Sequence, residues 1–197
     1  QLLKYYLVRH IRSSCLEEIQ DKGCEWTFAL NSIITPKLRS VLSMGFYASV
    51  NLQFVTANRI DTLGTSSFSH CYNIKVMRMD NVIRIPSFCF HSCKTLQTCS
   101  FMKCTQIDDQ AFEQCFLLRE LQVPKLNKIA NECISTNQTD FRFNPPISDD
   151  LFKQAVKISE TPKTTTTNQL QKRFQGLEYY LSVFKSSSVA IKIKIRI

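Results

Sequence analysis

The sequence predicts an α/β solenoid, a fold in which short similar turns stack along one axis. The first observation is a pattern of apolar and small residues that recurs every 22 residues from Ile19 to Ile129. The second is that residues 36–41 (PKLRSV) recur, four periods later, as residues 124–129 (PKLNKI). Repeats of about 20–29 residues with leucine-type spacing are typical of leucine-rich repeat solenoids. We therefore expect roughly five stacked turns between residues 19 and 134.

Each turn is predicted to contribute one strand to a parallel sheet on the concave face. Cys99 and Phe101 are separated by one residue, Ser100. Buried residues at every second position are typical of a strand with one buried face. The same alternation recurs in the other turns, at Val55 and Ala57, Met77 and Met79, and Leu121 and Val123.

The segments that return from one strand to the next are predicted to be short helices or irregular. In residues 108–115, Asp108 is a good helix N-cap, and Ala111, Phe112 and Cys115 would share one helical face. We therefore expect one or two helical turns in each return segment.

The 22-residue period also sorts residues into columns, meaning the equivalent positions of successive turns. One column is an expected aromatic spine, made of Phe46, Phe68, Phe90 and Phe112. Three of the nine cysteines (Cys71, Cys93 and Cys115) share a column with Thr27, Ser49 and Asn137. Small polar groups of this kind can bond to loop backbone. Most of the cysteines are therefore interpreted as packing residues with free thiols.

The best-defined unit, from Ile107 to Ile129, resembles the BspA-like leucine-rich repeats. The unit begins with Ile107, followed by a small residue and phenylalanine at Ala111-Phe112 and by Cys115 three residues later. Its apolar positions then continue with Leu118, Leu121 and Val123-Pro124. Earlier units depart from this pattern, since Ser49 and Thr27 replace the cysteine. The resemblance implies a non-catalytic interaction surface, often on surface-exposed or host-contacting proteins. It does not identify a ligand.

The candidate binding residues are the outward positions of the predicted strands. They form two neighbouring columns, one with Ser32, Phe54, Val76, Thr98 and Glu120, and one with Ile34, Thr56, Arg78, Ser100 and Gln122. This mixture of polar, small and apolar groups suits a protein or peptide partner. Just beyond the strands, four of five positions in a third column are cationic, namely Lys37, Arg59, Lys103 and Lys125, with Asn81 between them. The column is either a strip for an acidic partner or an ordinary solvated edge.

The formal net charge of +9 raises the question of nucleic-acid binding. No zinc finger, recognition helix or RNA-binding aromatic motif accompanies this charge, so we do not expect specific nucleic-acid binding.

Catalytic and cofactor motifs are missing from the sequence. His70 and His91 occupy variable positions of the return segments, and Cys89-x-His91-x-Cys93 does not have the spacing of a zinc site. The four glycines form no phosphate-binding loop. We predict no enzyme, metal or cofactor.

The two ends of the chain are predicted to differ from the repeats. Residues 1–18 would be an N-terminal cap or remnant, and residues 135–160 a C-terminal flank in which the register fails after Ile134 and a short helix begins near Asp150. Residues 161–168 are predicted to be a Thr-rich linker. In residues 169–197 an apolar helical stripe precedes an alternating apolar and basic strand. This tail would either cap the solenoid or contact an anionic membrane or a partner.

With this resemblance, the sequence predicts a non-catalytic protein-interaction module that binds through the concave sheet face, in adhesion or surface recognition. The alternative is an intracellular scaffold or regulatory subunit, which the free thiols favour. The compartment, cytoplasmic or cell surface, the oligomeric state and the use of the Asn137 glycosylation sequon are left open.

Overall fold

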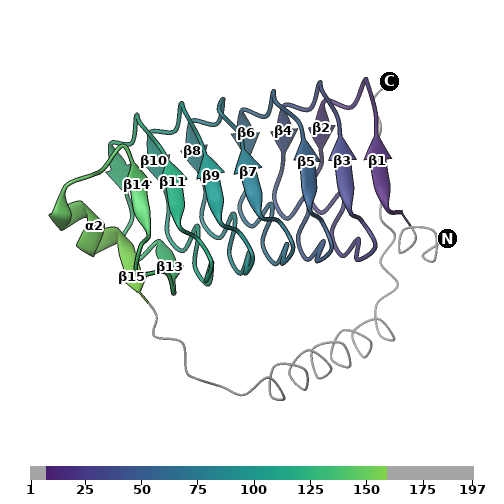
Figure 1. The fold of residues 1–197 in the computed structure, drawn as a ribbon. Helices are drawn as coiled ribbons and strands as arrows, with labels where there is room; N and C mark the ends of the chain where they lie inside the picture. Colours follow the sequence, from purple (N-terminus) through teal and green to yellow (C-terminus); the bar gives the residue numbers. More distant parts are fainter. Residues whose placement is uncertain (1–7, 159–197) are drawn as a thin grey trace, which may run out of the picture. The chain divides into compact units, whose positions relative to one another are not determined.

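The computed structural model describes residues 8–158, which form a parallel β-solenoid of the leucine-rich repeat type (Figure 1). The first row of strands contains seven three-residue strands: β1 (His10–Arg12), β3 (Ser32–Ile34), β5 (Phe54–Thr56), β7 (Val76–Arg78), β9 (Thr98–Ser100), β11 (Glu120–Gln122) and β14 (Arg142–Asn144). The second row contains six two-residue strands: β2 (Glu18–Ile19), β4 (Ser40–Val41), β6 (Thr62–Leu63), β8 (Arg84–Ile85), β10 (Gln106–Ile107) and β12 (Lys128–Ile129). Three further elements lie near the end of the described residues, outside these two rows: β13 (Ile134–Thr136), α2 (Asp149–Ala155) and β15 (Val156–Ile158).

Paired strands are parallel and offset by one period, as in Thr98↔Glu120 and Gln106↔Lys128. This offset extends beyond the residues in which the side-chain pattern is clear. Strand β1 pairs with β3 at the N-terminal end, and β14 pairs with β11 at the C-terminal end. The structure therefore contains about seven turns rather than five, and the expected loss of register after Ile134 is wrong. Backbone hydrogen bonds maintain the register there without the leucine pattern.

The last turn is closed by aromatic packing. The short helix predicted near Asp150 is confirmed as α2, whose N-cap Ser148 accepts a hydrogen bond from the Leu151 N–H. Phe152 of α2 packs against Phe141 and Phe143, with ring centroids 6.0 and 6.1 Å away. Phe143 continues the buried column of Met77, Cys99 and Leu121.

The return segments are not helical, because five of them have two residues with left-handed backbone and the last has one. Positive φ angles occur in two columns, at Lys22, Met44, Ser66, Phe88, Gln110 and Glu132, and at Trp26, Ala48, His70, Ser92 and Gln114. A left-handed residue ends a right-handed helix. Most N–H groups in these columns donate to the next turn, for example from His70 to the His91 carbonyl at 2.8 Å. Asp108 caps no helix, and its carboxylate instead accepts from Arg84 and Gln106.

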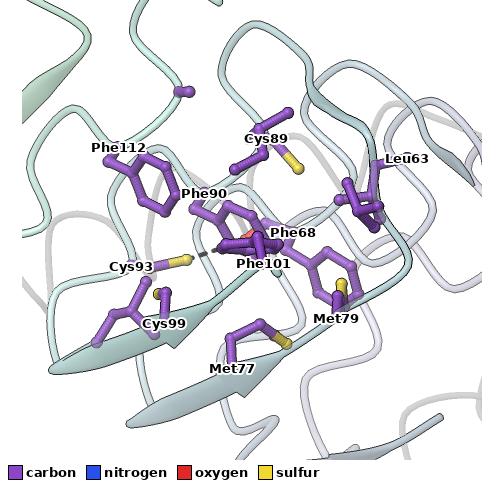
Figure 2. Packing of buried hydrophobic residues seen from close by; sticks show 14 of the residues in the cluster. Leu63, Phe68, Met77, Met79, Cys89, Phe90, Cys93, Cys99, Phe101 and Phe112 are labelled. Atoms are coloured by element: carbon purple, nitrogen blue, oxygen red, sulfur yellow. Dashed lines mark hydrogen bonds between the residues drawn. The ribbon is translucent and has the colours of Figure 1, made fainter. Parts of the chain in front are cut away.

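The aromatic spine is confirmed as the centre of the core (Figure 2). Successive rings of Phe46, Phe68, Phe90 and Phe112 stack with centroids 5.2–5.6 Å apart, and all four side chains are fully buried. The column of small residues beside the spine is equally constrained, since a Cβ added at Gly45 would lie 2.6 Å from Val41 Cγ1.

The thiol column bonds to loop backbone as expected. Cys71, Cys93 and Cys115 each donate to the carbonyl of the residue 25 positions earlier, at 3.1–3.2 Å, and Ser49 makes the same bond at 3.0 Å. Figure 2 shows this bond for Cys93 within the spine. The column thus stabilises the return segments and belongs to the scaffold.

The predicted linker (161–168) and tail (169–197) lie outside the described residues. Within residues 8–158, no helix is long and apolar enough to cross a membrane.

Candidate functional site

The ten candidate binding residues lie on or directly beside the seven long strands, which define what we call the long-strand face. Six of them belong to strands β5, β7, β9 and β11: Phe54, Thr56, Arg78, Ser100, Glu120 and Gln122. The remaining four follow a long strand by three residues: Lys37, Arg59, Lys103 and Lys125. The strand register aligns Arg78, Ser100 and Gln122 across three neighbouring turns.

In the C-terminal half of this face, Glu120 and Ser100 are hydrogen-bonded to side chains of neighbouring residues and turns. The Glu120 carboxylate accepts hydrogen bonds from Asn144 at 2.9 Å, from Gln122 at 3.2 Å and from Arg142 at 3.2 Å. These bonds hold the pKa of Glu120 below its usual value, the Asn144 and Gln122 amides contributing most. The carboxyl group therefore remains ionised and engaged at neutral pH.

Ser100 also has its hydrogen-bonding capacity used within the protein. It is buried, and its hydroxyl donates to the Asp80 carboxylate at 2.7 Å. The 22-residue period places Ser100, Glu120 and Gln122 on the face but does not reveal these pairings. Extending the Glu120 column by 22 residues would have found its partner Arg142.

The N-terminal half of the face presents apolar and cationic side chains instead. Phe54 and Val76 are 60% and 54% exposed, and Ile34 is 37% exposed. Arg12, Thr56 and Arg78 are also exposed. A partner that docks on this half could bury apolar area without displacing an internal hydrogen-bond network.

The cationic column continues along the face as an exposed row. Lys37, Arg59, Lys103 and Lys125 are all exposed. Within residues 8–158, the recorded salt bridges use other side chains, and Lys103 Nζ donates to the neutral Asn81 amide at 2.8 Å. These four cations are therefore available to an acidic partner.

Charge is strongly segregated between this face and the rest of the solenoid. We count the seven long strands, each with the residue before it and the three residues after it. These segments hold ten of the 17 cationic side chains of residues 8–158, but only two of the 14 acidic ones. The cations are Arg9, Arg12, Lys37, Arg59, Lys75, Arg78, Lys103, Arg119, Lys125 and Arg142, and the acids are Asp80 and Glu120. The remaining seven cations and twelve acids leave the rest of the solenoid net negative.

The cysteines are not grouped as metal ligands in the part of the chain that the structure describes. Eight of the nine are buried, and all nine are free thiols. Burial raises the pKa of Cys24 and Cys89 to about 12, which disfavours the thiolate that binds metals. Across the described ranges, no cluster of three or more His, Cys, Asp or Glu side chains is placed to hold a metal ion.

Two histidine rings lie against each other, tilted by 48°, in the return segments apart from the long-strand face. His70 and His91 have ring centroids 5.2 Å apart, and Ser69 Oγ lies 2.8 Å from His70 Nδ1. Burial, helped by the nearby His91 and Lys94, lowers the pKa of His70 from its ordinary 6.5 to about 4. Burial also lowers the pKa of His91, against the opposing effect of Glu113.

Acid is therefore expected to destabilise the return segments through His70. Because its pKa is lower in the folded chain, the unfolded chain binds more protons between pH 6.5 and 4, so stability falls as the pH drops through that window. The melting temperature of His70→Phe should fall less than that of the wild type between pH 7 and pH 5, where most carboxylates stay ionised. Parallel melting profiles for the two proteins would contradict this account.

Comparison with known proteins agrees with the observed architecture. The model of the BspA-type leucine-rich repeat region, in six copies, matches residues 17–140. A crystal structure of a leucine-rich repeat protein from Bacteroides ovatus ATCC 8483 superposes with a TM-score of 0.53 at 17% identity, over 69% of this chain and 42% of that one. The chain thus spans less than half the length of that protein, and the likeness concerns the fold alone. A search of curated proteins found no match. Since the family model covers more than half of the sequence and the strands repeat with its period, the chain belongs to the BspA-type leucine-rich repeat family.

Proposed function

We propose that this chain is a non-catalytic interaction module that binds an acidic protein or peptide on its long-strand face. Leucine-rich repeat proteins are generally protein-interaction modules, and the proposal adds the face and the charge of the partner. The observation that carries it is the charge segregation, with ten cations and two acids on the face of a solenoid whose other surfaces are net negative. Both acids on the face are already hydrogen-bonded within the protein.

The physical basis is electrostatic complementarity. A surface of one sign of charge speeds encounter with a partner of the opposite sign and disfavours partners of the same sign. Adhesion or surface recognition is the setting we propose for this binding.

Charge reversal tests the proposal. The probe is a fluorescein-labelled peptide of eight aspartate and glutamate residues, with its binding to the full chain followed by anisotropy. Lys103→Glu/Lys125→Glu is expected to weaken binding by about tenfold or more, with an unchanged melting temperature, because attraction at both positions becomes repulsion.

The matched control is Lys128→Glu/Lys153→Glu, which reverses two exposed cations away from the long-strand face. Its binding should fall clearly less than that of Lys103→Glu/Lys125→Glu, because it makes the same change in net charge outside the long-strand face. Equal losses in the two double variants would remove the long-strand face as the binding site.

An intracellular scaffold or regulatory subunit is the second candidate, favoured by the nine unpaired thiols. Labelling intact source cells with a membrane-impermeant biotin reagent separates the two settings. Capture of the protein from intact cells supports surface recognition, whereas capture only after lysis supports the scaffold.

A further inference from the structure

Strand pairing is interrupted at a single boundary between neighbouring turns of the described solenoid. The long strands form two separate sheets, β1-β3-β5 and β7-β9-β11-β14, and the short strands form β2-β4-β6 and β8-β10-β12. Both rows therefore break between the same two turns, at β5/β7 and at β6/β8. In Figure 1 these strands stand next to each other in the middle of the two rows.

Two backbone hydrogen bonds that flank the long strands in other turns are missing at this boundary of residues 8–158. Thr35, Met79, Phe101 and Val123 each donate an N–H to the next turn, whereas the equivalent bond from Ala57 to Arg78 is absent in the described chain. The N–H groups of Gln53 and Gln97 donate to carbonyls of the preceding turn. The equivalent bond, from the Lys75 N–H to Gln53, is absent in residues 8–158.

Pro86 accounts for part of the interruption. At its position in other turns, Leu42, Gly64, Asp108 and Ala130 donate an N–H to the residue 23 positions earlier. Proline has no N–H, so the Leu63 carbonyl cannot receive this bond from Pro86.

The return segments at the same boundary remain joined. The N–H groups of Ser66, Phe68 and His70 donate across it at 3.2, 2.9 and 2.8 Å, and the Phe68 and Phe90 rings stack 5.6 Å apart. The two turns are therefore held together along their return segments and lack strand pairing on the opposite side.

The most exposed large apolar side chains surround this break. Phe54 is 60% exposed, Ile83 58% and Val76 54%, more than any other large apolar side chain of the described residues. Phe54 and Val76 occupy the same column in the two unpaired turns, on the long-strand face. Three exposed cations accompany them on those turns, namely Arg59, Lys75 and Arg78.

We propose that this break is the anchoring point of the partner. An acidic segment of the partner places a large apolar side chain against Phe54 and Val76, while its carboxylates pair with Arg59, Lys75 and Arg78. The inference rests on the proposed function and adds the apolar anchor to it. Binding energy concentrates where a large apolar group becomes fully desolvated, with charged groups around it giving orientation and selectivity.

The same features distinguish an acidic polypeptide from a nucleic acid. A phosphate backbone would use the cations alone, with binding that weakens steeply as salt increases. The exposed Phe54 and Val76 give an acidic peptide with apolar side chains an advantage over a purely charged polymer.

The test compares three labelled probes on the full chain: the peptide Glu-Asp-Glu-Phe-Asp-Leu-Glu-Asp, the same peptide with serine in place of phenylalanine and leucine, and a single-stranded DNA oligonucleotide of equal charge. Phe54→Ser/Val76→Ser is expected to weaken binding of the first probe by about tenfold and to leave the serine probe within about twofold. The control Leu117→Ser/Leu151→Ser removes two exposed apolar side chains elsewhere and should alter neither.

The outcomes separate this inference from the proposed function. If Phe54→Ser/Val76→Ser changes nothing while Lys103→Glu/Lys125→Glu abolishes binding, the face binds acidic partners and the anchor is refuted. If both double variants bind the first probe like the wild type, the anchor and the proposed function both fail. Tighter binding of the DNA than of the first peptide would also overturn the inference.

Hydrogen exchange tests the break without a partner. Because they lack the bonds between turns, the amides of Ala57 and Lys75 should exchange faster than those of Thr35 and Gln97, their equivalents in paired turns. Equal protection would refute the interruption.

Discussion

Phe90→Ala is expected to lower the free energy of unfolding by about 3–5 kcal/mol, the range for truncating a buried phenylalanine. The Phe90 side chain is fully buried, and its ring stacks on Phe68 at 5.6 Å and on Phe112 at 5.2 Å. Phe101 packs on the same ring at 5.7 Å. The substitution would therefore leave a cavity in the middle of the spine, where a stacked turn has little freedom to collapse.

The size of this loss follows from the one-dimensional architecture. Each turn of a solenoid contacts only its neighbours, so a defect at Phe90 weakens two interfaces between turns at once. Domains of ordinary stability have about 5–15 kcal/mol in total, so the variant should unfold at a much lower urea concentration.

Phe54→Ala is the matched control, since Phe54 is 60% exposed on the long-strand face. Its free energy of unfolding should stay within about 0.5 kcal/mol of the wild type, as for other surface substitutions. Urea unfolding of both variants provides the measurement. Equal losses in the two would show that the spine does not dominate the core.

The native protein is expected to expose one rapidly reacting thiol among its nine cysteines. Cys15 is exposed, whereas the other eight cysteines are buried. Burial raises the pKa of Cys24, Cys89 and Cys133 to about 12 and that of Cys104 to about 11. It raises the pKa of Cys71, Cys93, Cys99 and Cys115 as well. A rise of three pKa units lowers the thiolate fraction near pH 8 by about a thousandfold.

Titration with a disulfide reagent, without prior reduction, measures this difference. We expect one thiol to react quickly in the native protein, none in Cys15→Ser, and all nine of the wild-type protein in denaturant. Fewer than nine in denaturant would indicate disulfides, and several fast thiols in the native protein would contradict their burial.

For the candidate site, the 22-residue period predicts which residues lie on the same face, but not which side chains are hydrogen-bonded to one another. Counting in steps of 22 residues places Phe54, Thr56 and Arg78 on neighbouring strands and Lys103 and Lys125 in one column, as the structure has them. Counting could not reveal that Ser100 is hydrogen-bonded to Asp80, or that Asn144 and Arg142 engage Glu120, because those pairings depend on side-chain positions in neighbouring turns.

The sequence by itself determined the repeat length, the parallel strands, the phenylalanine spine and the thiol column. All four follow from which side chains recur at one position, and a buried column selects its residues by size and polarity. The tertiary structure decided three features: the left-handed return segments, the two additional turns and the break at Pro86. The physical reason is that these features depend on backbone hydrogen bonds between residues about 22 positions apart. Such bonds join Lys22 and Ser66, both at positive φ, to the next turn, and they keep β14 in register without the leucine pattern.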